Sequence, residues 1–243
     1  MTVFANCGIF VSILYYSFKK RRFSEEFFLK KHLNYFLPAV KWVIIALAVG
    51  LICGFVGSAF HLAIDFAGEC LGARPWVLLL LPVAGLIIVF SYKTCSLPVY
   101  MGTDTVFEAT RTRDNIPPAL APLIFFSSFL THLCGGSSGR EGAALQLGGG
   151  IANLLGRVLK LNEEDMHTIE MCGMGALFSA LFGTPIGATF FVIAVVDVGF
   201  FHYKALLPGL IASLTAFLIA GALGIAPTRF ALLDGLFVPH SAS

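Results

Sequence analysis

Charged residues are scarce in this chain: Asp, Glu, Lys and Arg make up only 12% of its 243 residues. Soluble domains usually carry about a quarter charged residues. Hydrophobic residues account for 57% of the chain, and its mean hydropathy is +0.86. This balance excludes an ordinary soluble domain and predicts an integral, multi-pass membrane protein.

Several functional signatures are also missing from the sequence. The net charge of +2 is too small to indicate nucleic-acid binding, and no basic stripe alternates with aromatic residues. The six cysteines include no C-x-x-C pair, so no disulfide framework is indicated. The histidines lack metal-ligand spacing, and no Ser-His-Asp order or nucleophile elbow occurs. We therefore expect no metal site, no cofactor and no enzymatic activity.

The first apolar run, over residues 3–18, is followed by its basic cluster, Lys19–Arg22. A secretory signal peptide has the opposite order. The basic residues predict a cytoplasmic or interfacial segment. We expect three regions, which are this N-terminal segment over residues 1–34, a transmembrane region over residues 35–225 and a mixed tail over residues 226–243.

The apolar segments predict a series of helices, several of which are short or broken by glycine. Ala46, Gly50, Gly54 and Ser58 recur every four residues and predict a face for close helix packing. Short, broken helices are typical of membrane folds that direct half-helices toward a midplane site. The expected helices cover residues 38–64, 76–92, 119–133, 141–160, 167–182, 185–201 and 205–224, with a polar loop over 65–75.

The most informative segment is the glycine-rich turn over residues 135–142, which carries Arg140 and Glu141 between two strongly apolar stretches. Irregular backbone and charge persist at membrane depth only where protein or a water-filled cavity surrounds them. The turn also leads into a helix, whose first N–H groups and dipole attract anions. If that helix begins near Gly139, Glu141 lies in its first turn and can occupy an anion site until it is protonated or displaced.

Plainer roles stay open for these residues. Glu141 can be an ordinary first-turn acid with glycines that serve packing. Arg140 can attract anions or pair with a nearby carbonyl or acid. His132, before the turn, is expected to be a helix-end polar residue, and residues 163–170 to be a solvated loop in preference to a metal site.

The Gly-Arg-Glu-Gly sequence at residues 139–142 resembles the G-[KR]-E-G-P motif of CLC chloride channels and chloride/proton antiporters, with Ala143 in place of the proline. Residues 182–191 resemble the proline-led helix that follows it in that family. The resemblance covers roughly residues 35–224, the first of the two inverted repeats of a CLC subunit. It implies an all-α polytopic membrane fold with short, tilted and broken helices.

The resemblance also implies site residues. Glu141 would be the external gating glutamate, and the serine-bearing turn of the family would map to residues 102–106. Thr103 then replaces the serine, and its hydroxyl can donate to an anion. Asp104 would repel an anion unless it points away or caps a helix, which is the favoured role. The implied anion-binding residues are Gly139, Arg140, Gly142 and Thr103.

Two departures from the family pattern affect the mechanism. Antiporters use an inner glutamate as a proton relay, and the matched positions here are Ala194 and Val195. Asp197 lies nearby and can substitute, although a helix-end acid is the favoured role. The second repeat is also absent, so the chain is either a fragment or assembles with a second chain that supplies this repeat. Separately, the resemblance implies a homodimer.

The resulting expectation is transport of chloride or another small anion across a lipid bilayer, in the manner of a voltage-gated chloride channel of the cell (plasma) membrane. Fluoride transport and chloride/proton antiport are the alternatives within the family. A half-length, non-conducting chain that needs a partner is the alternative outside it. Nucleic acid is not expected to bind.

Overall fold

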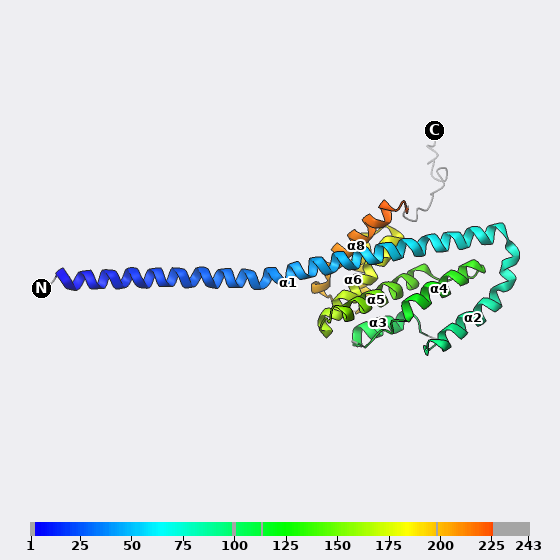
Figure 1. Cartoon of the computed structure of the whole chain (residues 1–243), viewed down its shortest axis with the longest axis horizontal. Helices are drawn as coiled ribbons and strands as arrows, with labels where there is room; N and C mark the ends of the chain where they lie inside the picture. Colours follow the sequence, from blue (N-terminus) through cyan, green and yellow to red (C-terminus); the bar gives the residue numbers. More distant parts are fainter. Residues whose placement is uncertain (1–2, 99–100, 113, 198, 226–243) are drawn as a thin grey trace, which may run out of the picture. The chain divides into compact units, whose positions relative to one another are not determined.

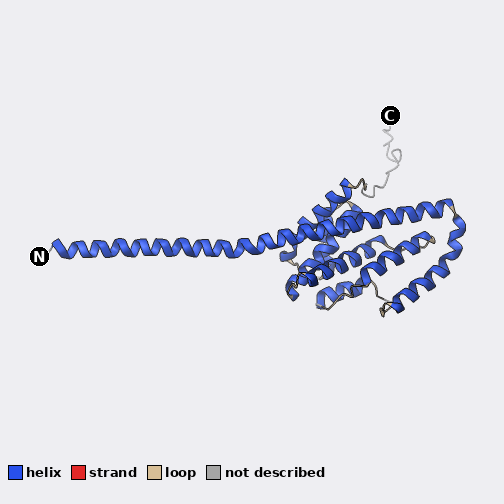
Figure 2. Cartoon of the chain, in the orientation of Figure 1, coloured by secondary structure: helices blue, strands red, loops and turns tan. Residues whose placement is uncertain are grey.

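The computed structural model describes residues 3–98, 101–112, 114–197 and 199–225, with side chains from Pro38 onward. These residues form helices and contain no strand, as expected (Figure 2). In chain order (Figure 1), the helices are α1 (Val3–Ala73), the 3-10 helix η1 (Pro75–Leu80), α2 (Leu81–Thr94), α3 (Thr103–Thr112), α4 (Leu120–Leu133), α5 (Arg140–Val158), α6 (Glu163–Phe182), α7 (Pro185–Val196) and α8 (Tyr203–Ala222).

The chain divides into two compact units, residues 1–44 and 45–243, and helix α1 has residues in both. The first unit is helical from Val3 onward. The second unit contains the remaining helices. The expected tail over residues 226–243 lies outside the described residues.

Among the described residues, three helical segments are long and apolar enough to cross a membrane: Pro38–Ala73, Pro75–Thr94 and Tyr203–Ala222. Helices α4 and α7 are apolar but shorter. Helix α2 leaves most of its apolar side chains exposed, including Leu86 and Phe90. An apolar surface of this kind is suited to contact with lipid or with another membrane-embedded chain.

The predicted loop over residues 65–75 is wrong, because α1 continues through this segment to Ala73. Asp65 and Glu69 lie on the exposed side of the helix, while Ile64 and Ala67 stay buried. The helical period of the apolar residues therefore continues past the first polar residue.

The segment that starts at Glu163 is also not a loop but the first turn of α6. The Asn162 side chain accepts a hydrogen bond of 2.8 Å from the backbone N–H of Asp165 and caps the helix. The acidic residues that follow suit the positive end of the helix dipole. At its other end, α6 stops at Gly183, whose φ of 69° is accessible to glycine.

The predicted small-residue face of α1 is confirmed as a packing face. A Cβ atom added at Gly50 would lie 2.5 Å from the carbonyl oxygen of Ala212 in α8, and one added at Gly54 would lie 3.1 Å from Cα of Ala216. Helix α6 packs against α5, α7 and α8. Close helix contacts of this kind hold the start of α5 and the end of α7 in place for the polar groups described next.

Candidate functional site

Helix α5 begins at Arg140, with Gly139 as its extended N-cap residue, so the helix starts where the sequence predicted. Glu141 lies in the first turn and is exposed. Its carboxylate turns back toward the N-cap, since a Cβ atom built on Gly139 would stand 3.5 Å from Oε2 of Glu141. Gly139 has no side chain that could accept a hydrogen bond from the first N–H groups of α5. These N–H groups therefore stay available to an acceptor on the side where the Glu141 carboxylate lies.

Thr103, the first residue of α3, lies directly against the start of α5. Its Oγ1 atom would be only 2.6 Å from a Cβ atom at Gly142, so glycine is required for this approach. The buried Gln146 side chain donates a hydrogen bond of 3.0 Å from Nε2 to Thr103 Oγ1. Because Oγ1 accepts this bond, its own hydrogen remains able to point toward a ligand.

Arg140, which was also predicted to bind the anion, and Asp104, which was not, take other positions. Arg140 Nη2 lies 3.5 Å from Asp65 Oδ1, which makes Arg140 the partner of an acid on α1. Asp104 lies in the first turn of α3 and is exposed, so it points away from the packed interior. The fold thus brings together Glu141, Gly139, Gly142 and Thr103, and it turns Arg140 toward Asp65.

A second polar group joins α5 to α6. The amide of the buried Asn153 donates a hydrogen bond of 2.6 Å to Oε1 of Glu170, which is also buried. Arg157, one turn further along α5, donates to the Ile116 carbonyl at 2.8 Å. These side chains line a cavity of about 350 Å³. The pairing satisfies a carboxylate that would be costly to bury alone.

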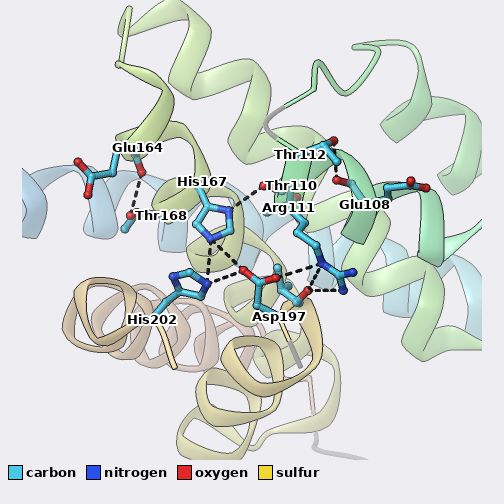
Figure 3. Close-up of polar contacts among 10 residues, drawn as sticks. Glu108, Thr110, Arg111, Thr112, Glu164, His167, Thr168, Asp197 and His202 are labelled. Carbon is cyan, nitrogen blue, oxygen red and sulfur yellow. Dashed lines mark hydrogen bonds and ion pairs between the residues drawn. The ribbon is translucent and has the colours of Figure 1, made fainter. Parts of the chain in front are cut away.

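A third polar group consists of His167, Asp197 and His202, and Figure 3 shows these side chains turned toward one another. The two Nε2 atoms of the histidines are 3.4 Å apart. Asp197 Oδ2 lies 2.6 Å from His202 Nε2 and 4.0 Å from His167 Nε2. We call these three residues the His–Asp cluster.

Two neighbouring contacts orient the His–Asp cluster. Arg111 Nε lies 3.0 Å from Asp197 Oδ1, and Arg111 Nη2 donates to the Val196 carbonyl at 3.0 Å. His167 Nδ1 lies 2.7 Å from the Thr110 carbonyl oxygen. The last turn of α3 therefore contacts both Asp197 and His167, on the side of the cluster away from His202 (Figure 3).

Asp197 occupies the end of α7 as its C-cap residue, the role that the sequence favoured. The cluster around it was not predicted, because its members come from α6, the end of α7 and the residue before α8. His132 has the helix-end role expected of it, with Nδ1 2.8 Å from the Ser128 carbonyl oxygen. The nearest sequence signal for the cluster was the pair Asp197 and His202, whose spacing fits no regular helix face.

Residues 84–239 of the chain match the family model described as voltage gated chloride channel. The chain is 34% identical over 198 residues to the chloride/fluoride channel protein of Pseudomonas syringae pv. tomato, with 81% of this chain and 44% of that protein covered. It is 25% identical over 166 residues to the H(+)/Cl(-) exchange transporter ClcA of Vibrio parahaemolyticus, with 62% and 36% covered.

Among solved structures, a CLC-type fluoride/proton antiporter matches with a TM-score of 0.74 and 34% identity, over 83% of this chain and 51% of that one. A slow cyanobacterial Cl-/H+ antiporter matches with a TM-score of 0.55 and 18% identity, over 82% and 50%, which is a likeness of fold alone. The chain spans about half the length of the curated relatives it matches.

Proposed function

The chain belongs to the family of voltage-gated chloride channels, the CLC family, and from that premise we propose that it carries small anions across the membrane. The proposed anion site is the start of α5, and Glu141 is its gate. The anion loses part of its hydration shell and is stabilised by the N–H groups around residues 139–142 and by the hydroxyl of Thr103.

The observation that supports this proposal most directly is the contact of Thr103 with Gly142. It sets a hydroxyl beside a helix start that has no side-chain cap. Gln146 donates to Thr103 Oγ1, which polarises the hydroxyl toward an anion. An ionised Glu141 competes with the anion for the same donors and blocks the site. Protonation or displacement of Glu141 opens it.

The gate is tested by anion efflux from liposomes that contain the purified chain, measured at several pH values. Glu141→Gln removes the ionisable group with little change in shape, so we expect efflux to lose its pH dependence. Glu69→Gln is the matched control, because Glu69 is an exposed carboxylate of α1 outside the proposed site. A pH dependence that is the same in Glu141→Gln and in the unaltered chain disproves the gating role.

The transported anion is chloride in our first proposal and fluoride in the second. Fluoride is favoured by the two matches at 34% identity, one named a chloride/fluoride channel protein and the other a fluoride/proton antiporter. The same efflux assay separates these candidates when chloride and fluoride gradients are compared at equal concentration. If an excess of fluoride leaves chloride efflux unchanged, chloride is the transported anion. If an excess of chloride leaves fluoride efflux unchanged, fluoride is the transported anion.

We propose passive conduction as the first candidate mechanism, because Ala194 and Val195 cannot carry a proton where the antiporters have their inner glutamate. Voltage dependence would arise if the charge of Glu141 moves through part of the membrane field. Proton-coupled exchange is the second candidate, since one solved relative at 34% identity is an antiporter. Proton uptake driven by an outward anion gradient, measured with a pH electrode, would contradict passive conduction.

A further inference from the structure

The His–Asp cluster has a geometry that the proposed anion pathway does not use. We propose that His167, Asp197 and His202 bind one divalent transition-metal ion of the Zn²⁺ type. The proposed ligand atoms are the two Nε2 atoms and Asp197 Oδ2. This site is independent of the anion site at the start of α5.

The distances suit a tetrahedral ion. With metal–ligand bonds of about 2.0–2.1 Å, two ligands of a tetrahedral Zn²⁺ lie about 3.3 Å apart. The two imidazole Nε2 atoms are 3.4 Å apart. Asp197 Oδ2 is closer than that to His202 and further from His167, at 2.6 Å and 4.0 Å. The mean of these two separations is 3.3 Å, the tetrahedral value.

Surrounding contacts orient two of the three proposed ligands, His167 and Asp197. The Thr110 carbonyl can only accept, so His167 Nδ1 carries the hydrogen and Nε2 carries the lone pair of the neutral ring. Arg111 pairs with Asp197 through Oδ1, which leaves Oδ2 turned toward the imidazoles. Outer contacts that fix the tautomer and the carboxylate in this way accompany metal-ligating histidines in general.

The open side of the cluster provides room for a fourth ligand. A cavity of about 520 Å³ adjoins the three residues and is also lined by Glu164 and Lys204, which form an ion pair with each other. The Arg111 guanidinium balances the Asp197 carboxylate. Water from this cavity would complete the tetrahedron, as in sites with three protein ligands.

The ligand set defines the class of ion. Two imidazole nitrogens and one carboxylate oxygen suit Zn²⁺ and its neighbours in the first transition row, whereas Mg²⁺ and Ca²⁺ prefer all-oxygen sites. His202 Nε2 faces Asp197 Oδ2 at 2.6 Å. A neutral His202 with its hydrogen on Nδ1 presents the Nε2 lone pair to the metal.

Titration calorimetry with Zn²⁺ on the full chain in lipid nanodiscs tests the site. We expect one ion per chain, and we expect His167→Ala or His202→Ala to weaken binding at least about tenfold. His132→Ala is the matched control, since His132 is a helix-end histidine outside the cluster, and it should bind like the unaltered chain. Affinity that is unchanged in both cluster variants overturns the proposal.

Two measurements on the unaltered chain remain decisive if a variant fails to fold. Bound Co²⁺ should show the intense visible absorption of a tetrahedral site, and weak octahedral absorption alone contradicts the geometry. Zn²⁺ should also protect His167 and His202 from acylation by diethyl pyrocarbonate, and leave the labelling of His132 unchanged. If Zn²⁺ leaves the labelling of His167 and His202 unchanged, as it should for His132, the proposal is overturned.

Discussion

Gly142 is the single residue on which the geometry of the candidate anion site depends most. Its lack of a Cβ atom allows Thr103 to reach the first turn of α5, where Oγ1 also accepts from Gln146. The site is therefore built by a small residue as much as by the charged ones around it. Glu141 is the charged residue of this turn, but the Thr103 hydroxyl can approach the turn only because residue 142 is glycine.

We expect Gly142→Ala to displace the Thr103 hydroxyl and to break its hydrogen bond with Gln146. Overpacking at such a contact destabilises by about 1–3 kcal/mol. Anion efflux should fall in the same variant, because one donor to the anion is lost. Thermal unfolding and liposome efflux measure the two effects.

Gly85→Ala is the control for this substitution, because Gly85 lies in α2 with nothing within 4 Å of an added Cβ atom. We expect it to leave efflux unchanged and to be neutral or to stabilise by up to about 1 kcal/mol, since alanine favours the helix. If Gly142→Ala leaves both the efflux and the unfolding temperature of the chain unchanged, the close contact of Thr103 with residue 142 does not require glycine.

At the scale of the helices, the close crossing of α5 and α6 brings together the buried side chains of Asn153 and Glu170. An added Cβ atom at Gly173 of α6 would meet the Gly148 carbonyl and Cβ of Ala152 on α5. The backbones therefore touch at this crossing, and Asn153 can reach Glu170 at 2.6 Å. The approach of the two helices also sets the position of the α5 start relative to the rest of the unit.

We expect Gly173→Ala to force these two helices apart and to lower the free energy of unfolding by about 1–3 kcal/mol. Gly221→Ala, in α8, is the matched control, because no atom lies within 4 Å of the added Cβ. That substitution should be neutral or stabilise by up to about 1 kcal/mol, since alanine favours the helix. Unfolding curves in the same detergent compare the two variants, and equal stability would contradict a tight crossing.

Much of the helical pattern could be predicted from the sequence, because helices such as α4 and α8 are continuous apolar runs with clear ends. The continuation of α1 past Asp65 was missed, since polar residues on the exposed side of a helix resemble a loop in a linear pattern. The start of α5 and the place of Glu141 were predicted from the glycines before them. The His–Asp cluster was not, because three separate segments form it only after the helices have packed.

At the scale of the whole molecule, the described chain would supply one side of the proposed anion site. In that proposal Thr103 and the start of α5 supply the donors, and Gly139 and Glu141 are exposed in the described chain. A carboxylate at membrane depth costs about 2.5–3.5 kcal/mol unless protein or water surrounds it. A second polypeptide that covers this face would remove that cost and complete the pathway.

We therefore expect the conducting particle to contain at least two copies of the chain. Native mass spectrometry of the chain in lipid nanodiscs should detect a dimer, and liposomes prepared from the same sample should release anions. The Glu141→Gln chain serves as the control, because a change at the gate should alter efflux and leave the number of copies the same. The expectation is contradicted if particles with a single chain release anions at the rate of the unfractionated sample. One chain would then be sufficient for efflux, without a second polypeptide around Glu141.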